Sequence, residues 1–417
     1  MLKAIVMSKK GWSVLPNDAT RPISSSLASV ATGKTSRLGS LITCCLSVTS
    51  LLIVPPVNGA EVARRIEVGA QRTIKTLSDA SRVARDGDIV EVDAGDYHQD
   101  VAVWTQNDLT LRARNGRARL IAQGASAEGK GIWVIRGGKV TVEGFDFIGA
   151  KVPDNNGAGI RFERGDLKIE NCRFFENENG VLTGNDGVSV LEIKNSEFGY
   201  NGFGDGQGHN LYVGAIARLK VTGSYSHHAK IGHLLKSRAA KNLIFYNRLT
   251  DETGGTASYE LEFPGGGLAY VVGNVIQQSS TTDNSTVISF GAEGYRSQAN
   301  RLYLINNTLV DMRPHGGQFL RVKAGGEVMA VNNLLVGKNR LEDGGTGEYR
   351  NNFNVDLDEF VLAVREDFHL KPGSKLIGKA VAVDAVDGVV LRPTAEYQHP
   401  RTVRALKSGA LSPGAMQ

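Results

Sequence analysis

A short motif of alternating apolar and polar residues returns along most of the chain, each time followed by a turn residue and a second apolar stretch. The first clear copy covers residues 140–147, with Val140 and Val142 before the turn at Gly144. In the next four copies the turn residue moves by 27, 24, 28 and 24 positions, to Asn171, Asn195, Gly223 and Asn247. Alternation with a period of two predicts short strands that turn one face to an interior.

Strands this short cannot bury their inner faces alone, so the repeat predicts that successive copies stack as rungs of a solenoid. In such a stack the backbone groups of each rung pair with the neighbouring rungs, about 4.8 Å away. The motif continues to Asn333 and fades beyond Asn354, and the 50 glycines suit many tight turns. Asparagine at the turn can adopt left-handed backbone angles and form side-chain ladders, which is a structural role. The predicted fold class is all-β, a right-handed parallel β-helix.

The way the repeat begins and ends predicts three segments. Residues 61–355 are the β-helix, with an N-terminal cap that contains a short amphipathic helix beginning near Ile74. Residues 356–417 are an irregular C-terminal strap packed on the β-helix. Residues 1–60 are predicted to be a signal or targeting segment, because a basic stretch precedes the apolar run 41–54 and small residues follow at 59–60.

Composition narrows the partners of such an exported chain. Without residues 1–60, Cys172 is the only cysteine, so no intrachain disulfide is expected. The formal net charge is +5, but the basic residues are scattered and no nucleic-acid-binding motif is present. We therefore expect a periplasmic or secreted monomer that does not bind nucleic acid, does not associate with a membrane after cleavage, and binds an acidic polysaccharide.

The start and the tail of the predicted β-helix are similar to those of a known superfamily. The predicted cap ends in Asp-Gly-Asp-Ile-Val at 86–90, and Gly-Asp-Tyr follows at 95–97; the tail has a segment at 368–377 and ends in Ser-Pro-Gly-Ala at 412–415. These features resemble the pectate-lyase-like superfamily of right-handed β-helices. That resemblance implies the fold, whereas the superfamily includes lyases, hydrolases, esterases, epimerases and non-catalytic proteins.

The rungs between residues 205 and 267 depart from the repeat by carrying polar groups. Four of the eight histidines fall in this window. Aligned without a gap, Leu219 falls on Leu243, Leu211 on Leu235, and Tyr212 on Lys236. With the leucines inside, alternation predicts an outer face that carries, from rung to rung, Asn210, Tyr212, Lys236, Glu260 and Glu262. The two glutamates would then stand about 6.6 Å apart along one strand.

The Lys-Ser pair at 236–237 resembles the base-bearing rung of the family of alginate lyases and chondroitin B lyases. In that family a lysine on this strand takes the C5 proton of a uronate and an arginine on the next rung assists. The resemblance implies that role for Lys236. The expected place of the arginine is occupied by residues 260–262, and Arg238 lies on another rung.

The hypothesis that follows is β-elimination on a uronate-containing polysaccharide, which needs a neutralised carboxylate, a base and an acid. Lys236 is the candidate base, with Arg238 or Lys230 as positive neighbours, and Tyr212 or His233 is the candidate acid. Glu260 and Glu262 could hold a Ca²⁺ ion that neutralises the substrate. The candidate substrate-binding residues are His209, Asn210, His228, Lys230 and Tyr259.

Other functions fit the same residues. Glu260 and Glu262 could serve an inverting glycoside hydrolase, whose carboxyl groups stand about 6.5–9.5 Å apart. The groove could also belong to a non-catalytic glycan-binding or export factor. In a purely structural interpretation, Lys236 and the glutamates form a charge ladder and His209 and His233 a stack of rings. Assays on acidic polysaccharides distinguish these alternatives.

Overall fold

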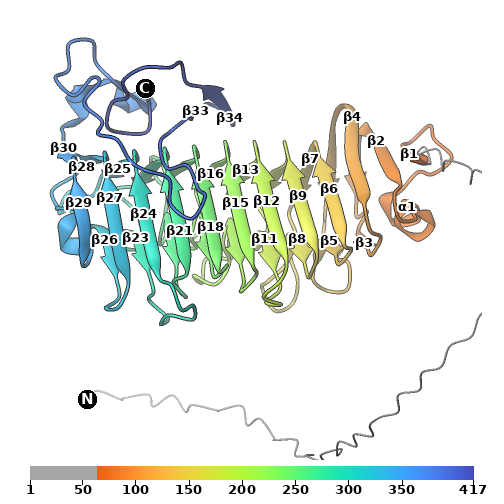
Figure 1. The fold of residues 1–417 in the computed structure, drawn as a ribbon. Helices are drawn as coiled ribbons and strands as arrows, with labels where there is room; N and C mark the ends of the chain where they lie inside the picture. The colour runs from red at the N-terminus through yellow and green to blue at the C-terminus, as the bar shows by residue number, and fades with distance from the viewer. Residues whose placement is uncertain (1–62) are drawn as a thin grey trace, which may run out of the picture. The chain divides into compact units, whose positions relative to one another are not determined.

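The computed structural model describes residues 63–417, and these fold as a right-handed parallel β-helix (Figure 1). The fold predicted from the repeat is thereby confirmed. The predicted targeting segment, residues 1–60, lies outside the described residues. Within residues 63–417, no helix has the length and apolar character needed to cross a membrane.

Each rung contributes two strands to sheet A, one on either side of the asparagine turn. The strands before the turn form one row: β6 (Lys139–Glu143), β9 (Asp166–Glu170), β12 (Val190–Lys194), β15 (Arg218–Thr222), β18 (Lys241–Phe245), β21 (Leu268–Val272), β24 (Arg301–Ile305), β27 (Glu327–Val331) and β29 (Gly347–Arg350). Those after the turn form a second row: β7 (Phe145–Ile148), β10 (Arg173–Phe175), β13 (Glu197–Gly199), β16 (Tyr225–His227), β19 (Arg248–Thr250), β22 (Val275–Gln278), β25 (Thr308–Asp311), β28 (Leu334–Val336) and β30 (Phe353–Asn354). At the N-terminal end, β1 (Arg65–Val68), β2 (Ile89–His98) and β4 (Leu109–Ile121) join the same sheet.

Sheet B closes each rung with a third strand. Its nine strands are β3 (Ala102–Trp104), β5 (Gly131–Ile135), β8 (Ala158–Phe162), β11 (Asn179–Thr183), β14 (Leu211–Val213), β17 (Lys236–Ser237), β20 (Leu261–Phe263), β23 (Thr286–Phe290) and β26 (Gln318–Val322). Every neighbouring pair in sheets A and B is parallel, and apart from a register shift between β2 and β4 near Asp93 the strands are in register, so equivalent side chains stack along the axis. Inside, the rings of Phe147, Phe174 and Phe198 stack with centroids 4.9 and 4.8 Å apart.

At the turn between the two rows of sheet A, the left-handed backbone angles and the side-chain ladder belong to two successive residues. The sequence pattern had assigned both roles to one asparagine. The first turn residue adopts left-handed angles, as Asn306 and Asn332 do with φ of 52° and 61°. The second turn residue forms the ladder: Asn274 donates to Asn307 at 3.0 Å, and Asn307 to Asn333 at 3.1 Å. A pair of asparagines at one turn therefore supplies both the backbone angle and the ladder.

A short helix lies at the N-terminal end of the stack, and irregular chain follows its C-terminal end. Helix α1 (Leu77–Val83) begins after Thr76, whose side chain accepts a hydrogen bond from the Asp79 amide, and it buries Leu77 and Ala80 against the first rungs. At the other end the C-terminal strap contains two antiparallel pairs, β31 (Phe360–Leu362) with β32 (Asp367–Leu370), and β33 (Ala395–Gln398) with β34 (Thr402–Ala405). Three short 3₁₀ turns accompany them: η1 (Glu342–Gly344), η2 (Leu357–Glu359) and η3 (Ala363–Arg365).

The strap runs back along the outer face of sheet A. Arg401 pairs with Glu197 at 2.7 Å, and Tyr246 accepts a hydrogen bond from the Thr394 amide at 3.0 Å. Near the end of the chain the Ala415 amide donates to Thr308 at 3.0 Å. The outer face of sheet A is therefore partly covered, whereas sheet B faces away from these contacts.

The gap-free alignment of Leu219 with Leu243 is wrong by one residue. Leu219 pairs with Asn242, so that Leu243 faces outward and Ile244 faces the core. The chain from β17 to β18 is one residue shorter than the chain from β14 to β15. The missing residue lies after the sheet B strand of this rung. The alignment of Tyr212 with Lys236, which lies before it in the chain, is therefore unaffected.

Candidate functional site

Sheet B carries a row of outward side chains, one from each rung, in register along the axis. From β8 to β26 the row consists of Arg161, Leu182, Tyr212, Lys236, Glu262, Ser289 and Arg321. Adjacent members stand about 4.8 Å apart at the backbone. The predicted neighbours Tyr212 and Lys236 are confirmed as partners, and Glu262 follows on the next rung. A cation, Arg161 or Arg321, lies toward each end of the row.

Two cations converge on one phenol ring at the centre of this row. Arg238 directly follows β17, where its amide donates to the Val213 carbonyl at 2.9 Å and continues the strand pairing, so it leaves the same face as Lys236 two residues earlier. The Lys236 ammonium lies 5.9 Å from the centroid of the Tyr212 ring, and the Arg238 guanidinium lies 5.2 Å from it. The sequence places Arg238 on a different rung from the assisting arginine of the alginate lyase family, but its position just after β17 brings it beside Tyr212.

Two carboxylates hold these cations in place. Glu262 lies 3.2 Å from the Lys236 ammonium, and Glu293 binds Arg238 through two contacts of 2.5 and 2.9 Å. The hydrogen bond from Arg238 holds the pKa of the Glu293 carboxyl below its usual value. Glu293 was missed in the sequence because it lies in the loop after β23. The only signal was the longer interval between turn residues there, from Asn274 to Asn307.

A row of rings borders the cations on one side. The rings of His209 and His233 are 4.4 Å apart, and Tyr259 lies edge-on to His233 at 5.0 Å. His209 accepts the His233 amide hydrogen at 3.0 Å, and His233 donates to Glu262 at 2.8 Å. Burial lowers the pKa of both imidazoles, His209 most strongly, so both are neutral near pH 7. Burial alone would raise the pKa of Glu262, but hydrogen bonds from His233 and Lys236 lower it.

The prediction that Glu260 and Glu262 share the outer face is wrong. Glu260 precedes β20 at the corner after β19, where strand alternation has not begun, and its side chain turns inward. It is completely buried, and neither carboxylate oxygen has a hydrogen-bond partner within residues 63–417. Burial therefore raises the pKa of Glu260 well above its usual value, with Asp251 adding to the effect. The two glutamates cannot act together as a hydrolase pair.

Because Glu260 and Glu262 do not face the same side, they cannot form the expected Ca²⁺ site together. Glu262 is already bound by His233 and Lys236, and Glu260 lies inside the β-helix. Across residues 63–417, no three acidic, histidine or cysteine side chains are arranged to hold a metal ion. The donor set present does not fit Ca²⁺.

Three predicted substrate-binding residues lie away from this site. Asn210 is fully buried. Its side-chain amide donates to the His227 carbonyl at 2.8 Å and accepts a hydrogen bond from Asn201, so it continues the asparagine ladder. Its predicted outward position is wrong. His228 lies on the outer side of sheet A, bound to His227 at 2.8 Å. Lys230 is exposed beside a separate cleft that also contains Phe203.

Comparisons with known proteins agree with the fold. A family model described as "Right handed beta helix region" matches residues 122–271. The chain is similar to the crystal structure of pectate lyase Pel9A, with a TM-score of 0.55 and 13% identity over 81% of this chain and 97% of that one. It is also similar to a variant of the PL6 family alginate lyase AlyGC, with a TM-score of 0.31 and 15% identity over 75% of this chain and 56% of that one. No curated protein matches the chain.

The family model and the likeness to pectate lyase Pel9A support the architecture. The chain is a right-handed parallel β-helix protein with a cluster of cations, rings and carboxylates on the outer face of sheet B. Its activity has to be argued from that cluster.

Proposed function

We propose that the protein cleaves a uronate-containing acidic polysaccharide by β-elimination on the outer face of sheet B. The observation that carries the proposal is the convergence of Lys236 and Arg238 on Tyr212, each within 6 Å of its ring. Arg161 and Arg321 extend the same row in both directions and would bind further acidic units of the polymer. Such a substrate fits a periplasmic or secreted location, as the N-terminal segment predicts.

Arg238 is proposed to neutralise the uronate carboxylate, because its planar guanidinium binds carboxylates through paired hydrogen bonds. Glu293 occupies Nε and Nη2 of Arg238 and fixes the orientation of the guanidinium. The Nη1 edge is then the one directed to the substrate. With the carboxylate charge offset, negative charge that develops at C5 during proton removal is stabilised.

Lys236 is proposed to be the acid and Tyr212 the base, which exchanges the roles expected from the sequence. The Lys236 ammonium is held by an ion pair with Glu262 and is the proposed proton donor. Two cations lie 5.9 and 5.2 Å from the centroid of the Tyr212 ring, and their positive charge can offset that of a phenolate. Tyr212 reacts as its phenolate, after its hydroxyl proton has been given to solvent. The phenolate oxygen takes the C5 proton, the C5–H electrons form the C4=C5 double bond, and the C4–O bond breaks. Lys236 gives its proton to the leaving oxygen.

The test is a screen of alginate, polygalacturonate, chondroitin and glucuronan, with and without added Ca²⁺. Elimination creates an unsaturated uronate that absorbs near ~235 nm. Tyr212→Phe and Lys236→Gln should each lower the rate by roughly 10²–10⁴-fold on the substrate that reacts. Arg238→Lys keeps the charge but loses the paired hydrogen bonds, and it should mainly raise KM.

The matched control is Lys220→Gln. Lys220 pairs with Glu192 at 3.0 Å on a neighbouring rung of sheet A, so it repeats the same kind of ion pair on a different face. This variant should keep full activity. Reducing ends without the absorbance, or a Tyr212→Phe variant as active as the wild type, would overturn the proposal. Binding without turnover would instead indicate a glycan-binding or export factor.

A further inference from the structure

A second polar cleft lies between the second row of sheet A and the C-terminal strap. It has a volume of about 460 Å³ and is lined by Tyr225, Arg248 and Glu252 of the β-helix and by Glu396, Tyr397 and His399 of the strap, among others. This volume is within the range of small-molecule sites, about 300–1,000 Å³. None of its lining residues belongs to the Tyr212–Lys236–Arg238 site.

The lining holds three arginines, Arg248, Arg365 and Arg404, and four carboxylates, so its formal charges nearly balance. Arg248 pairs with Glu252 at 2.9 Å and also with Glu366, and Arg404 pairs with Glu396. His369 lies 2.5 Å from Asp367 and 3.6 Å from Glu396. The hydrogen bond to Glu396 raises the pKa of His369 above its usual value, although burial acts in the opposite direction. The cleft therefore presents hydrogen-bond donors beside acceptors with little uncompensated charge.

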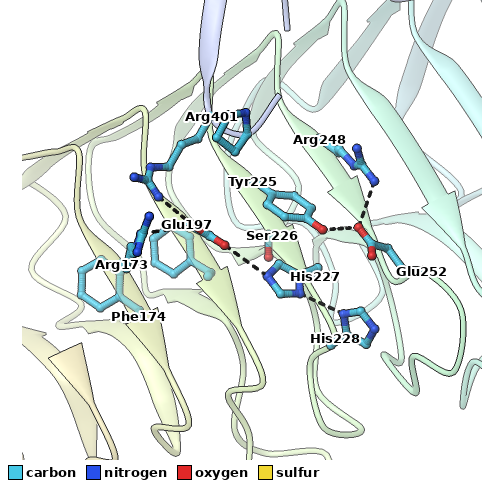
Figure 2. A network of polar contacts seen from close by, with 12 residues as sticks. Arg173, Phe174, Glu197, Tyr225, Ser226, His227, His228, Arg248, Glu252 and Arg401 are labelled. Atoms are coloured by element: carbon cyan, nitrogen blue, oxygen red, sulfur yellow. Dashed lines mark hydrogen bonds and ion pairs between the residues drawn. The ribbon is translucent and has the colours of Figure 1, made fainter. Parts of the chain in front are cut away.

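Aromatic rings form the other part of the wall. Figure 2 shows the Tyr225 ring beside Arg248 and Glu252, with its hydroxyl directed at the Glu252 carboxylate. The Arg248 guanidinium lies over that ring at 5.0 Å. From the strap, the His399 ring lies 5.4 Å from the Tyr225 ring and 6.3 Å from the Tyr397 ring.

The strap is fixed to the β-helix next to this cleft, so the cleft is formed before any ligand arrives. Arg401 reaches from the turn between β33 and β34 to Glu197, as Figure 2 shows. His227 fills the space above Gly199, where an added Cβ would stand 2.5 Å from the imidazole. A preformed site binds its ligand without the entropic cost of ordering the walls.

We propose that this cleft binds a neutral saccharide unit. A hydroxyl group both donates and accepts hydrogen bonds, so it can join an arginine and a glutamate that already neutralise each other. A uronate would instead add a carboxylate to a lining that already holds four carboxylates against three arginines, so a neutral sugar is favoured. The exposed ring of His399 offers a face to the sugar ring, and the buried rings of Tyr225 and Tyr397 support the wall behind it. This inference stands independently of the proposed elimination.

The experiment is calorimetric titration of the full-length protein with neutral hexasaccharides of β-1,4-glucan, β-1,4-xylan, β-1,4-mannan and α-1,4-glucan, and with trigalacturonate. At least one neutral hexasaccharide should bind. His399→Ala removes an exposed ring without breaking the ion pairs, and it should weaken that binding about tenfold or more, about 1.4 kcal/mol. Arg404→Ala should have a similar effect. Thermal unfolding of each variant checks that it is folded.

His315→Ala, an exposed histidine in the loop after β25, is the matched control and should bind as the wild type does. Lys236→Gln should also keep the neutral saccharide binding, which separates this cleft from the proposed active site. The proposal is overturned if none of the neutral hexasaccharides binds at about 10 mM, the weak end of specific binding. It is equally overturned if trigalacturonate displaces the neutral ligand, if His399→Ala binds unchanged, or if Lys236→Gln abolishes binding.

Discussion

Asp251 couples the stability of the β-helix to pH, and Asp251→Asn should remove that coupling. Its side chain is buried after β19, where Oδ2 accepts the Ala257 amide at 2.8 Å and Oδ1 has no partner in the described part of the chain. Burial raises the pKa of Asp251 from 3.8 to about 7, with the nearby charge of Glu252 adding to the effect. Asparagine keeps the acceptor for Ala257 and cannot ionise.

The sign and size follow from the two protonation states. Below about pH 4 the aspartate is protonated in both folded and unfolded chains and contributes no pH dependence. Between about pH 4 and pH 7 the unfolded chain ionises while the folded chain keeps its proton, so the free energy of unfolding falls. Roughly three units at about 1.4 kcal/mol each give a loss of roughly 4 kcal/mol by pH 7. Above that pH no further loss comes from this group.

The assay is urea denaturation followed by far-ultraviolet circular dichroism at pH 4, 5, 6, 7 and 8. Between the lowest and highest pH, Asp251→Asn should lose roughly 4 kcal/mol less stability than the wild type. Asp205→Asn makes the same change of charge at an exposed position in the loop before β14, and its stability curve should parallel that of the wild type. Parallel curves for Asp251→Asn and the wild type would refute the reasoning.

Three further substitutions test the scaffold that positions the site. Asn274→Ala removes the acceptor of the Asn247 amide and the donor to the Ile244 carbonyl, each a 2.8 Å bond, and should cost roughly 2–5 kcal/mol in chemical denaturation. Phe174→Ala leaves a cavity between the rings of Phe147 and Phe198 and should cost roughly 3–5 kcal/mol; a loss below about 1 kcal/mol would contradict the stacked core. Thr76→Ala removes the N-cap of α1 and should cost only about 1 kcal/mol, seen as faster hydrogen exchange in residues 77–83 without loss of the rungs.

The sequence predicted the fold because each rung repeats the same local instruction, an alternating strand followed by an asparagine or glycine turn. It also predicted that Tyr212 and Lys236 are neighbours, since Leu211 and Leu235 fix the inward face on both rungs. Arg238 is two residues after Lys236, so the sequence could also have placed it on the same face. Looking for an arginine on the next rung left that position out of account.

What the sequence could not predict depends on loops and corners. The turn between β17 and β18 is one residue shorter than its predecessor, which shifted Leu219 onto Asn242. Glu260 lies before the first residue of β20, so a rule for strands does not apply to its side chain. Glu293 reaches Arg238 from a loop whose path no periodicity describes. The cleft under the strap joins residues more than a hundred positions apart, and no repeat relates them.

The central claim is that the Tyr212 site eliminates across C4–C5 of a uronate. The most direct measurement is mass spectrometry of the products formed in oxygen-18-labelled water from the polysaccharide that reacts. Elimination adds no water, so the products should contain no heavy oxygen from the solvent and should carry the double bond that absorbs near ~235 nm. Heavy oxygen at the newly formed chain ends would show hydrolysis and contradict the account.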